Sequence, residues 1–430
     1  MRALVFFLFA ALLVWGQFQH TYAESERYGR YADIMPSEWK ATNVWLAAAD
    51  CALERGVWLA VCEQGKLVPM SERAIADDPG HALLLGLWSM ATRRHADLID
   101  VARLNTLTDT IGLLTLAGLL FALRAYITSI VLLWKGPIEY LGWMGTSPHW
   151  AYIGLVSLAA SAIGSTAARE MGLLSRRAAN LWIAAGIVLL GVATLMRESI
   201  GMMGLMVTAA VTVVLLARRI RPGPVLLVGL LAVLAFTTPR WVVMARDAAF
   251  EMQKAERLAT HGLSHTLYLG LGFVENKWGI RYDDDYGEEI AGKAGIVWCS
   301  PEYFRLMWQL YLGHWAEDPV EVARIYLEKA WMLLGTPTLY PGPPFGIVLA
   351  IGLVHFLAAT AFGAWRRIGF VQGLPIEGVA VAFAGLFLAQ AMAALPSHNY
   401  AMPVNAFVLV LLGVIVEFFA RALLAIRRAW

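Results

Sequence analysis

Long apolar runs dominate the chain, and short polar segments separate them. A helix needs about 17 to 25 mostly apolar residues to cross a bilayer, because each residue adds about 1.5 Å across a hydrocarbon core about 30 Å thick. The candidate runs are 3–18, 150–167, 178–196, 200–217, 224–238, 344–364, 376–395 and 402–420. A further run, 111–134, is interrupted by Arg124. This pattern predicts an all-α polytopic membrane protein.

Arginines mark one side of the predicted membrane. The short polar loops that hold them contain Arg169, Arg176 and Arg177, then Arg218, Arg219 and Arg221, then Arg366 and Arg367, and finally Arg421, Arg427 and Arg428. Such loops stay in the cytoplasm. Residues 20–108 are expected outside and 169–177 inside, so an odd number of spans must separate them. That requires 111–134 to be a tight hairpin that turns at Arg124. We therefore expect about ten spans, with both termini cytoplasmic.

This topology divides the chain into five regions with two large external segments. The five regions are a first transmembrane helix and signal anchor (1–19), a first periplasmic domain (20–108), a helical bundle (109–239), a second periplasmic segment (240–343) and C-terminal transmembrane helices (344–430). Cys51, Cys62 and Cys299 all fall in external segments, where an oxidising compartment permits disulfides. Cys51 and Cys62 flank a predicted hairpin that a disulfide could close. The layout predicts the inner membrane of a bacterium.

Composition narrows the functional classes. The chain of 430 residues is 59% hydrophobic and 15% charged, whereas a soluble domain is about 25% charged. Its 34 basic and 32 acidic residues are nearly balanced, which argues against nucleic acid as a partner, because nucleic acid requires a clustered basic surface. The aromatic content of 11% excludes a disordered chain. The remaining classes act in or at a membrane.

Arg197 lies at the expected external tip between two apolar runs, directly before Glu198. An arginine at that depth is costly unless it is paired, so its partner is either Glu198 or an anionic ligand. A guanidinium also binds phosphate through a bidentate fork. Similar reasoning selects Arg240, which follows a proline, and the last external turn with His398 and Tyr400.

The second external segment is rich in groups that bind ligands. His261 and His265 could share one helical face and bind a metal or phosphate, or they could be a packed, hydrogen-bonded pair. Four glycines between His261 and Ile280 indicate a closely packed loop of the kind that binds substrates. The candidate substrate-binding residues are His261, Tyr268, Asn276, Tyr282, His398 and Tyr400. Asp283 and Asp285 could chelate a divalent cation, or the acidic run could simply be solvated. No other cofactor is predicted.

Asp77 and Asp78 are the conspicuous acids of the first external segment. One of them is expected to cap a helix whose first residue is Pro79. The second acid could act as a general base at the rim of the membrane, where partial desolvation raises the pKa of a carboxylate.

The layout resembles the GT-C superfamily of polytopic membrane glycosyltransferases, which contains protein mannosyltransferases and the aminoarabinose transferase of lipid A. The shared elements are a first span, an external loop with Asp77 and Asp78, an external turn with Arg197, and a late segment with His265, Asn276, Lys277, Gly279, Tyr282 and Asp283. The resemblance implies a polyprenyl-phosphate sugar as donor and a lipid, glycan or protein as acceptor. It implies that Asp78 or Asp77 is the catalytic base. It also implies that Arg197, His265 and Lys277 lie near the donor phosphate.

Two questions stay open at this stage. The key acid of the family commonly lies soon after the first span, so Asp33 competes with Asp77 and Asp78 for the catalytic position. Alternative functions are an envelope polysaccharide polymerase or ligase, a transporter or flippase, and a non-catalytic subunit of an envelope complex. A transporter is expected to place charges at midplane, and the clear spans hold few beyond Glu377 and Glu417. Membrane lipid is an expected partner in every case, and nucleic acid is not.

Overall fold

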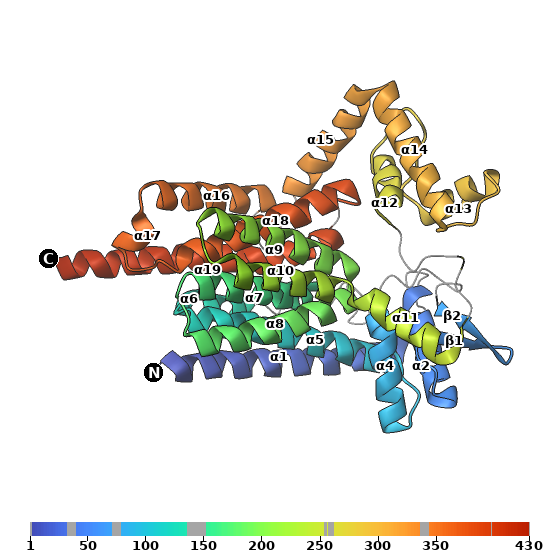
Figure 1. Ribbon diagram of the computed structural model, residues 1–430, viewed down its shortest axis with the longest axis horizontal. Coiled ribbons are helices and arrows are strands. Elements are labelled where there is room, and N and C mark those ends of the chain that lie inside the picture. The colour runs from blue at the N-terminus through green and yellow to red at the C-terminus, as the bar shows by residue number, and fades with distance from the viewer. Residues whose placement is uncertain are drawn as a thin grey trace.

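The computed structural model describes residues 2–31, 40–70, 79–135, 152–252, 256, 262–335, 344–396 and 398–429. These residues form a bundle of roughly parallel helices with folded units at one end (Figure 1). Five helices are long and apolar enough to cross a membrane: α5 (Leu98–Ala122), α8 (Arg176–Met196), α9 (Glu198–Ala217), α18 (Gly373–Ala393) and the segment Pro403–Arg427 of α19 (His398–Ala429). A sixth candidate is the pair α10 (Pro222–Phe236) and α11 (Thr238–Phe250), which is bent by 51°. A helical membrane protein is thus confirmed, while ten spans stay a prediction.

Small residues let the bundle helices approach closely. The bundle also contains α1 (Arg2–Tyr31), α6 (Tyr126–Lys135), α7 (Tyr152–Glu170), α16 (Phe345–Ala361) and α17 (Ala364–Arg367). A Cβ on Gly112 of α5 would clash with the carbonyl oxygen of Gly154 on α7. A Cβ on Gly186 of α8 would lie 2.5 Å from the Cα of Ala162. These contacts use the small-residue packing that helices adopt in lipid, where dispersion contacts replace the hydrophobic effect.

The hairpin expected at Arg124 is present. Helix α5 ends at Ala122, Arg124 has a φ of +63°, and α6 begins at Tyr126. The two arms are antiparallel, since the Ser129 hydroxyl donates to the carbonyl of Ala117 at 2.8 Å. The turn therefore lies where the sequence predicted it. The described part of the second arm, α6, has ten residues and is not among the five candidate spans, so its crossing of the membrane stays a prediction.

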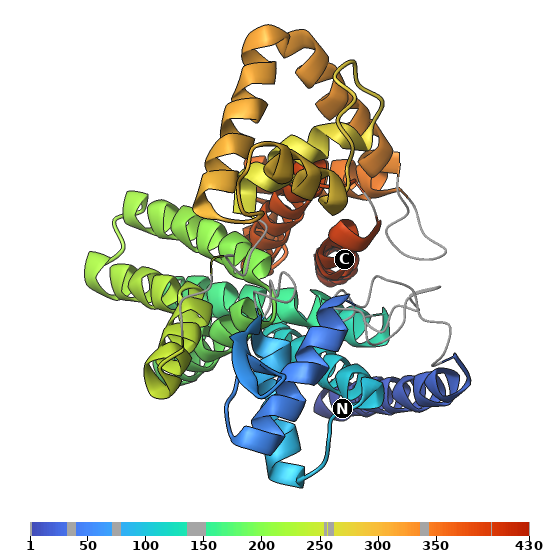
Figure 2. The ribbon, with the colours of Figure 1, turned by 90° about the vertical axis from the view of Figure 1, so that its right-hand side faces the viewer.

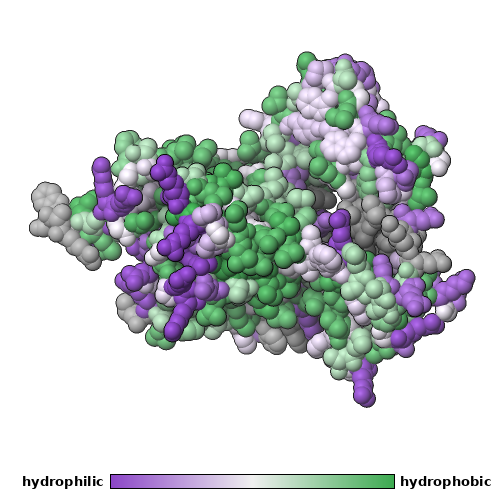
Figure 3. Space-filling view, viewed as in Figure 1, coloured by the Kyte–Doolittle hydropathy of each residue, from purple (hydrophilic) through white to green (hydrophobic). Residues whose placement is uncertain are grey.

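The two termini lie at the same end of the bundle (Figure 1). Arg421 of α19 donates to the carbonyl oxygens of Arg124 and Gly369, which joins three cationic segments. Arg2 lies over the ring of Tyr126 at 4.6 Å. We call this the arginine end. Hydrophilic residues gather towards both ends of the molecule, and an apolar band lies between them (Figure 3).

A first folded unit covers part of the opposite end. It consists of α2 (Lys40–Arg55), β1 (Ala60–Glu63), β2 (Lys66–Pro69), α4 (Pro79–Thr92) and α11, and we call it the α2–α4 unit. The strands pair antiparallel, with Glu63 opposite Lys66. A disulfide joins Cys51 to Cys62, as the sequence allowed. Arg246 of α11 donates a hydrogen bond to the carbonyl of Leu59, which joins α11 to the rest of the unit.

A second unit, which we call the lobe, lies on another side of the same end (Figure 2). It contains α12 (Gly262–Gly270), the 3-10 helix η4 (Leu271–Phe273), α13 (Asp284–Lys293), α14 (Pro301–Glu317) and α15 (Pro319–Gly335). Its core is aromatic and aliphatic, centred on Tyr303, Met307 and Ile325. The lobe contacts the bundle through α12 and α15, which pack against α16 and α18.

Candidate functional site

The start of α4 touches the turn between α8 and α9. A Cβ on Gly80 would lie 2.7 Å from the carbonyl oxygen of Leu195 and 2.9 Å from the amide nitrogen of Met196, so the contact needs glycine. Arg197 follows at once, and it is the single residue that separates the two helices. The sequence analysis selected both this turn and the segment that leads into α4, and the structure brings their described residues together.

His81 is buried directly behind this contact. Its ring stacks on Trp45 with centroids 4.1 Å apart, and Nε2 donates to the side-chain oxygen of Asn105 at 2.8 Å. Burial lowers the pKa of His81 to about 4, the hydrogen bond to Asn105 opposes that shift, and the charge of Arg197 adds to it. The imidazole is therefore neutral at pH 7. Its Nδ1 is a buried acceptor with no hydrogen-bond partner among the described residues.

Asp109 lies one helical turn beyond Asn105 on α5 and was not selected from the sequence. Its carboxylate accepts hydrogen bonds from the side chain of Gln17 at 2.8 Å and from the amide of Gly154 at 2.7 Å. Gly154 is the third residue of α7, so its amide has no partner within that helix. Asp109 thus caps α7 from a distance and ties α1, α5 and α7 together. The sequence signal that could have identified Asp109 is its spacing of four residues from Asn105, which puts two polar side chains on one helical face.

The three predicted catalytic acids lie outside the described residues. Asp77 and Asp78 precede Pro79, the first residue of α4, in the sequence. Asp33 and His261 also fall outside the described ranges, and His398 and Tyr400 lie in the first turn of α19. Their predicted roles are untested by the structure.

Arg240 is exposed on the first turn of α11, just beyond the bend from α10. That bend lies against α8, because a Cβ on Gly191 would be 3.2 Å from the hydroxyl of Thr238. Arg197 and Arg240 therefore both lie around the last two turns of α8. They are the two cations that we assign to the candidate site.

The remaining predicted phosphate ligands belong to the lobe. His265 is buried, with Nδ1 2.7 Å from the Tyr303 hydroxyl and Nε2 3.2 Å from a carboxylate oxygen of Asp284. The Asp284 carboxylate can only accept, so Nε2 carries the proton of the neutral imidazole and Nδ1 accepts from the Tyr303 hydroxyl. Burial raises the pKa of Tyr303 well above its ordinary value. Lys277 is bound to Asp318 at 2.9 Å and to Glu317 at 3.4 Å, and these acids raise its pKa.

The predicted substrate-binding residues of the lobe also make internal contacts. The Asn276 amide closes its own loop, donating to the carbonyls of Val274 and Ile280 and accepting from the amide of Ile280 at 3.0 Å. Tyr268 is buried and stacks on His314. Tyr282 packs edge-on against Phe273. These contacts organise the lobe, which is attached to different bundle helices from the ones that hold Arg197.

The acidic run at 283–285 begins a helix. The Asp283 carboxylate accepts from the amide of Asp285 at 3.0 Å and so caps α13, and Asp284 and Asp285 lie in its first turn. Acids at that place stabilise a helix through its dipole. Within the described ranges, no three His, Cys, Asp or Glu side chains converge as metal ligands. A cation at Asp283 and Asp285 stays a prediction.

Lys329 is a buried charge that the sequence analysis missed. Its ammonium donates to the carbonyl oxygens of Gly270 at 2.9 Å, Ala393 at 3.2 Å and Ala394 at 2.8 Å. Those carbonyls end α12 and α18, so the charge meets the negative ends of two helix dipoles. Burial lowers the pKa of Lys329 to about 7, while three acceptors engage all three N–H groups of the charged form. The signal was its position on the buried face of α15, in register with Val322, Ile325 and Leu333.

The two acids that the sequence places within clear apolar runs, Glu377 and Glu417, have protein partners. Glu417 accepts from the backbone amides of Tyr126, Ile127 and Thr128, so it caps α6, and it also pairs with Arg421. Glu377 lies 2.8 Å from Nδ1 of His355 on α16. Glu417 therefore serves the architecture of the bundle.

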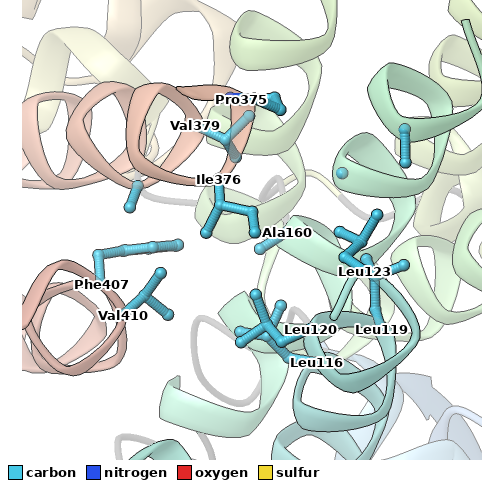
Figure 4. Close-up of a pocket in the computed structure, with 13 residues that line it drawn as sticks. Leu116, Leu119, Leu120, Leu123, Ala160, Pro375, Ile376, Val379, Phe407 and Val410 are labelled. Carbon is cyan, nitrogen blue, oxygen red and sulfur yellow. The ribbon is translucent and has the colours of Figure 1, made fainter. Parts of the chain in front are cut away.

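One apolar pocket lies between α5, α7, α18 and α19 (Figure 4). Its wall includes Leu120, Leu123, Pro375, Ile376 and Phe407, and no titratable side chain lines it. Leu123 and Pro375 place it towards the arginine end, whereas Arg197 lies at the other end. The pocket suits an apolar chain and contributes no group to the candidate site.

The surface around α4, Arg197 and Arg240 is the strongest candidate site in the described part of the chain, because it joins two independently predicted segments. No family model, curated protein or solved structure matches this chain.

Proposed function

We propose that the protein is a membrane glycosyltransferase that moves a sugar from a polyprenyl-phosphate donor to an acceptor hydroxyl. The observation that carries the proposal is the contact of Gly80 with the α8–α9 turn. It places the described start of α4, which directly follows Asp77 and Asp78 in the sequence, beside the turn that holds Arg197. Carboxylates this close in sequence to the contact would, together with the Arg197 guanidinium, supply a base and a phosphate ligand at one membrane face.

The proposed reaction is a single displacement. A carboxylate, Asp78 or Asp77, takes the proton from the acceptor hydroxyl as its oxygen attacks the anomeric carbon. The bond between that carbon and the phosphate oxygen breaks, and the electron pair leaves with polyprenyl phosphate. Arg197 stabilises the departing charge through paired N–H donors, and Arg240 adds a second positive charge. Attack opposite the leaving group inverts the anomeric configuration.

The orientation follows from the distribution of charge. If the arginine end faces the cytoplasm, as the positive-inside rule requires, the site opens on the periplasmic side of a bacterial inner membrane. The apolar band accommodates the polyprenyl tail at that level. His265 and Lys277 belong to the lobe, whereas Arg197 lies in the turn that Gly80 contacts, so we assign the donor phosphate to Arg197 and Arg240. Asp283 and Asp285 remain the proposed position for a divalent cation, if the reaction uses one.

The test is release of polyprenyl phosphate by the purified protein in nanodiscs, with a panel of polyprenyl-phosphate sugars as donors. We expect Asp78→Asn or Asp77→Asn to abolish release. Arg197→Gln should lower it by about 10- to 100-fold, since a hydrogen bond to a charged group contributes about 1.5–3 kcal/mol. The matched control is Arg218→Gln, at the opposite end of the same helix α9. It should retain full activity.

Other outcomes would change the assigned base or reaction, or would exclude the site. Loss in Asp33→Asn alone would move the base to Asp33. Turnover of a diphosphate-linked oligosaccharide that is sensitive to Arg240 but not to Asp77 or Asp78 would indicate a polymerase or ligase. Equal turnover in every variant would exclude this site. A parallel reaction with EDTA tests the cation, because a required metal would make release stop on chelation and resume when the metal is restored.

A further inference from the structure

Helix α15 has one apolar face that the lobe buries and a second that it leaves exposed. The buried face holds Val322, Ile325 and Leu333. On the other face, Val320 is 76% exposed, Leu327 71% and Trp331 80%. These three positions are separated by seven and then four residues, so they line one side of the helix. Three large apolar side chains exposed on one side of a helix, here called the stripe, indicate an interaction surface rather than a solvated helix face.

The charged side chains beside the stripe, Arg324 and Glu328, pair with each other. Arg324 lies four residues after Val320, and its guanidinium donates to Glu321 at 2.8 Å and to Glu328 at 2.7 Å. It also donates to the backbone carbonyl of Glu275. The guanidinium is thereby held by partners inside the lobe, and the stripe presents apolar atoms to its surroundings.

The stripe continues the apolar band of the bundle. The end of α15 meets the start of α16, where a Cβ on Gly346 would lie 3.2 Å from the carbonyl oxygen of Leu334. From there Ile347, Ile351 and Val354 are more than half exposed along α16. Helix α15 runs away from the side of the bundle, and the core of the lobe lies on one side of it (Figure 1). The stripe faces the other side, above the band in which lipid surrounds α16.

The charge of the lobe identifies the type of lipid surface. Residues 262–335 contain eleven acidic and six basic residues, a net charge of −5. Such a unit is repelled by anionic headgroups, so its attachment must come from apolar insertion. Trp331 is suited to that position because an indole buries its ring among acyl chains while its N–H stays at the headgroup level.

We propose that α15 is an interfacial helix that inserts Leu327 and Trp331 into the leaflet at the lobe end, and that the lobe rests on neutral lipid beside the bundle. The occupant of the stripe is the bilayer itself, not a second protein. This surface is independent of the proposed transferase activity. It fixes the height of the lobe relative to the membrane and adds a lipid contact outside the ring of spans.

Depth-dependent quenching tests this placement. Cys51 and Cys62 form a disulfide and Cys299 is buried, so a cysteine introduced at the surface is the accessible thiol of the native protein. We would introduce Leu327→Cys or Trp331→Cys, label it with an environment-sensitive fluorophore, and reconstitute the protein in phosphatidylcholine nanodiscs with or without brominated acyl chains. The matched control is Lys293→Cys, exposed on α13.

We expect brominated lipid to quench the labels at 327 and 331 at least two-fold and to leave the label at 293 unchanged. Equal, weak quenching at all three positions would overturn the proposal. Labels at 327 and 331 that resist both brominated lipid and an aqueous quencher would also overturn it, because a protein would then cover the stripe. Replacing part of the neutral lipid with anionic lipid should reduce quenching; an increase would contradict attachment through apolar insertion.

Discussion

The α2–α4 unit and the lobe lie at the end of the bundle opposite the arginine end. Both contact the bundle through backbone atoms, but different forces stabilise the two contacts. The α2–α4 unit contacts α8 through Gly80, whose neighbours are the carbonyl of Leu195 and the amide of Met196. The lobe contacts α18 through Gly270, whose carbonyl lies near those of Ala393 and Ala394 around one ammonium. Three carbonyl dipoles that converge repel one another unless a cation lies among them. The first contact therefore depends on shape, and the second on one charge.

This difference assigns different tasks to the two units. A contact between neutral backbones keeps its geometry as long as both helices are folded, which suits a site that must hold reacting groups within fractions of an ångström. A contact that depends on one ammonium can be lost without unfolding either unit. The contact of Gly80 with the end of α8, next to Arg197, is thus the better place for chemistry.

The largest expected effect comes from removing the ammonium. Lys329→Met preserves much of the volume but leaves three buried carbonyls without a donor, which costs about 3–5 kcal/mol. We expect faster hydrogen–deuterium exchange across the lobe and unchanged exchange in the α2–α4 unit. Lys293→Met is the control, since Lys293 is exposed and paired with Glu289. Faster exchange in both units, or in neither, would contradict the contrast between them.

Acidification should act on the α2–α4 unit through His81. The folded-state pKa of about 4 lies below the ordinary value of 6.5, so between these values the unfolded chain binds more protons than the folded one. Stability is therefore full above pH 6.5 and falls as the pH drops to 4, by about 3 kcal/mol in total. Thermal unfolding in detergent at several pH values would show this as a falling midpoint temperature.

The control for acidification replaces both partners. His81→Phe combined with Asn105→Leu keeps a ring against Trp45 and removes the titrating group together with its buried acceptor. The double variant should lose a large part of the dependence between pH 6.5 and 4. An unchanged dependence would assign the effect to other groups.

The smallest expected effect on stability is that of Gly80→Ala. Its Cβ would lie 2.7 Å from the carbonyl oxygen of Leu195, so α4 must shift away from the turn at a cost of about 1–3 kcal/mol. If the proposed site is correct, transferase activity should fall by far more than that stability loss explains. Gly292→Ala on α13, where a Cβ meets nothing within 4 Å, is the control. Full activity in Gly80→Ala would separate α4 from the site.

Local sequence signals predicted the features that depend on neighbouring residues. The break at Arg124 gave the hairpin, Pro79 gave the start of α4, and the spacing of Cys51 and Cys62 gave the disulfide. Each of these follows from backbone geometry or from a short loop. The same holds for the helical membrane class, because apolar run length is a local property of the sequence.

Features that depend on distant partners were not accessible in the same way. Lys329 meets carbonyls 59 to 65 positions away, and Asp109 meets Gln17 across 92 positions. Hydropathy shows such residues only as isolated charges. The polar loop around Asn276 shows the converse problem. The backbone of a loop needs hydrogen-bond partners. The Asn276 side chain, which we predicted to bind substrate, supplies them instead.

The cap that Glu417 provides for α6 has a consequence for how the chain is made. The carboxylate lies 289 to 291 positions after the amides that it satisfies. Until α19 has been made, those amides lack this carboxylate and depend on water at the arginine end. We therefore expect the α5–α6 hairpin to gain its final stability only when the last helix packs, so a chain truncated before α19 should be degraded faster than the full chain.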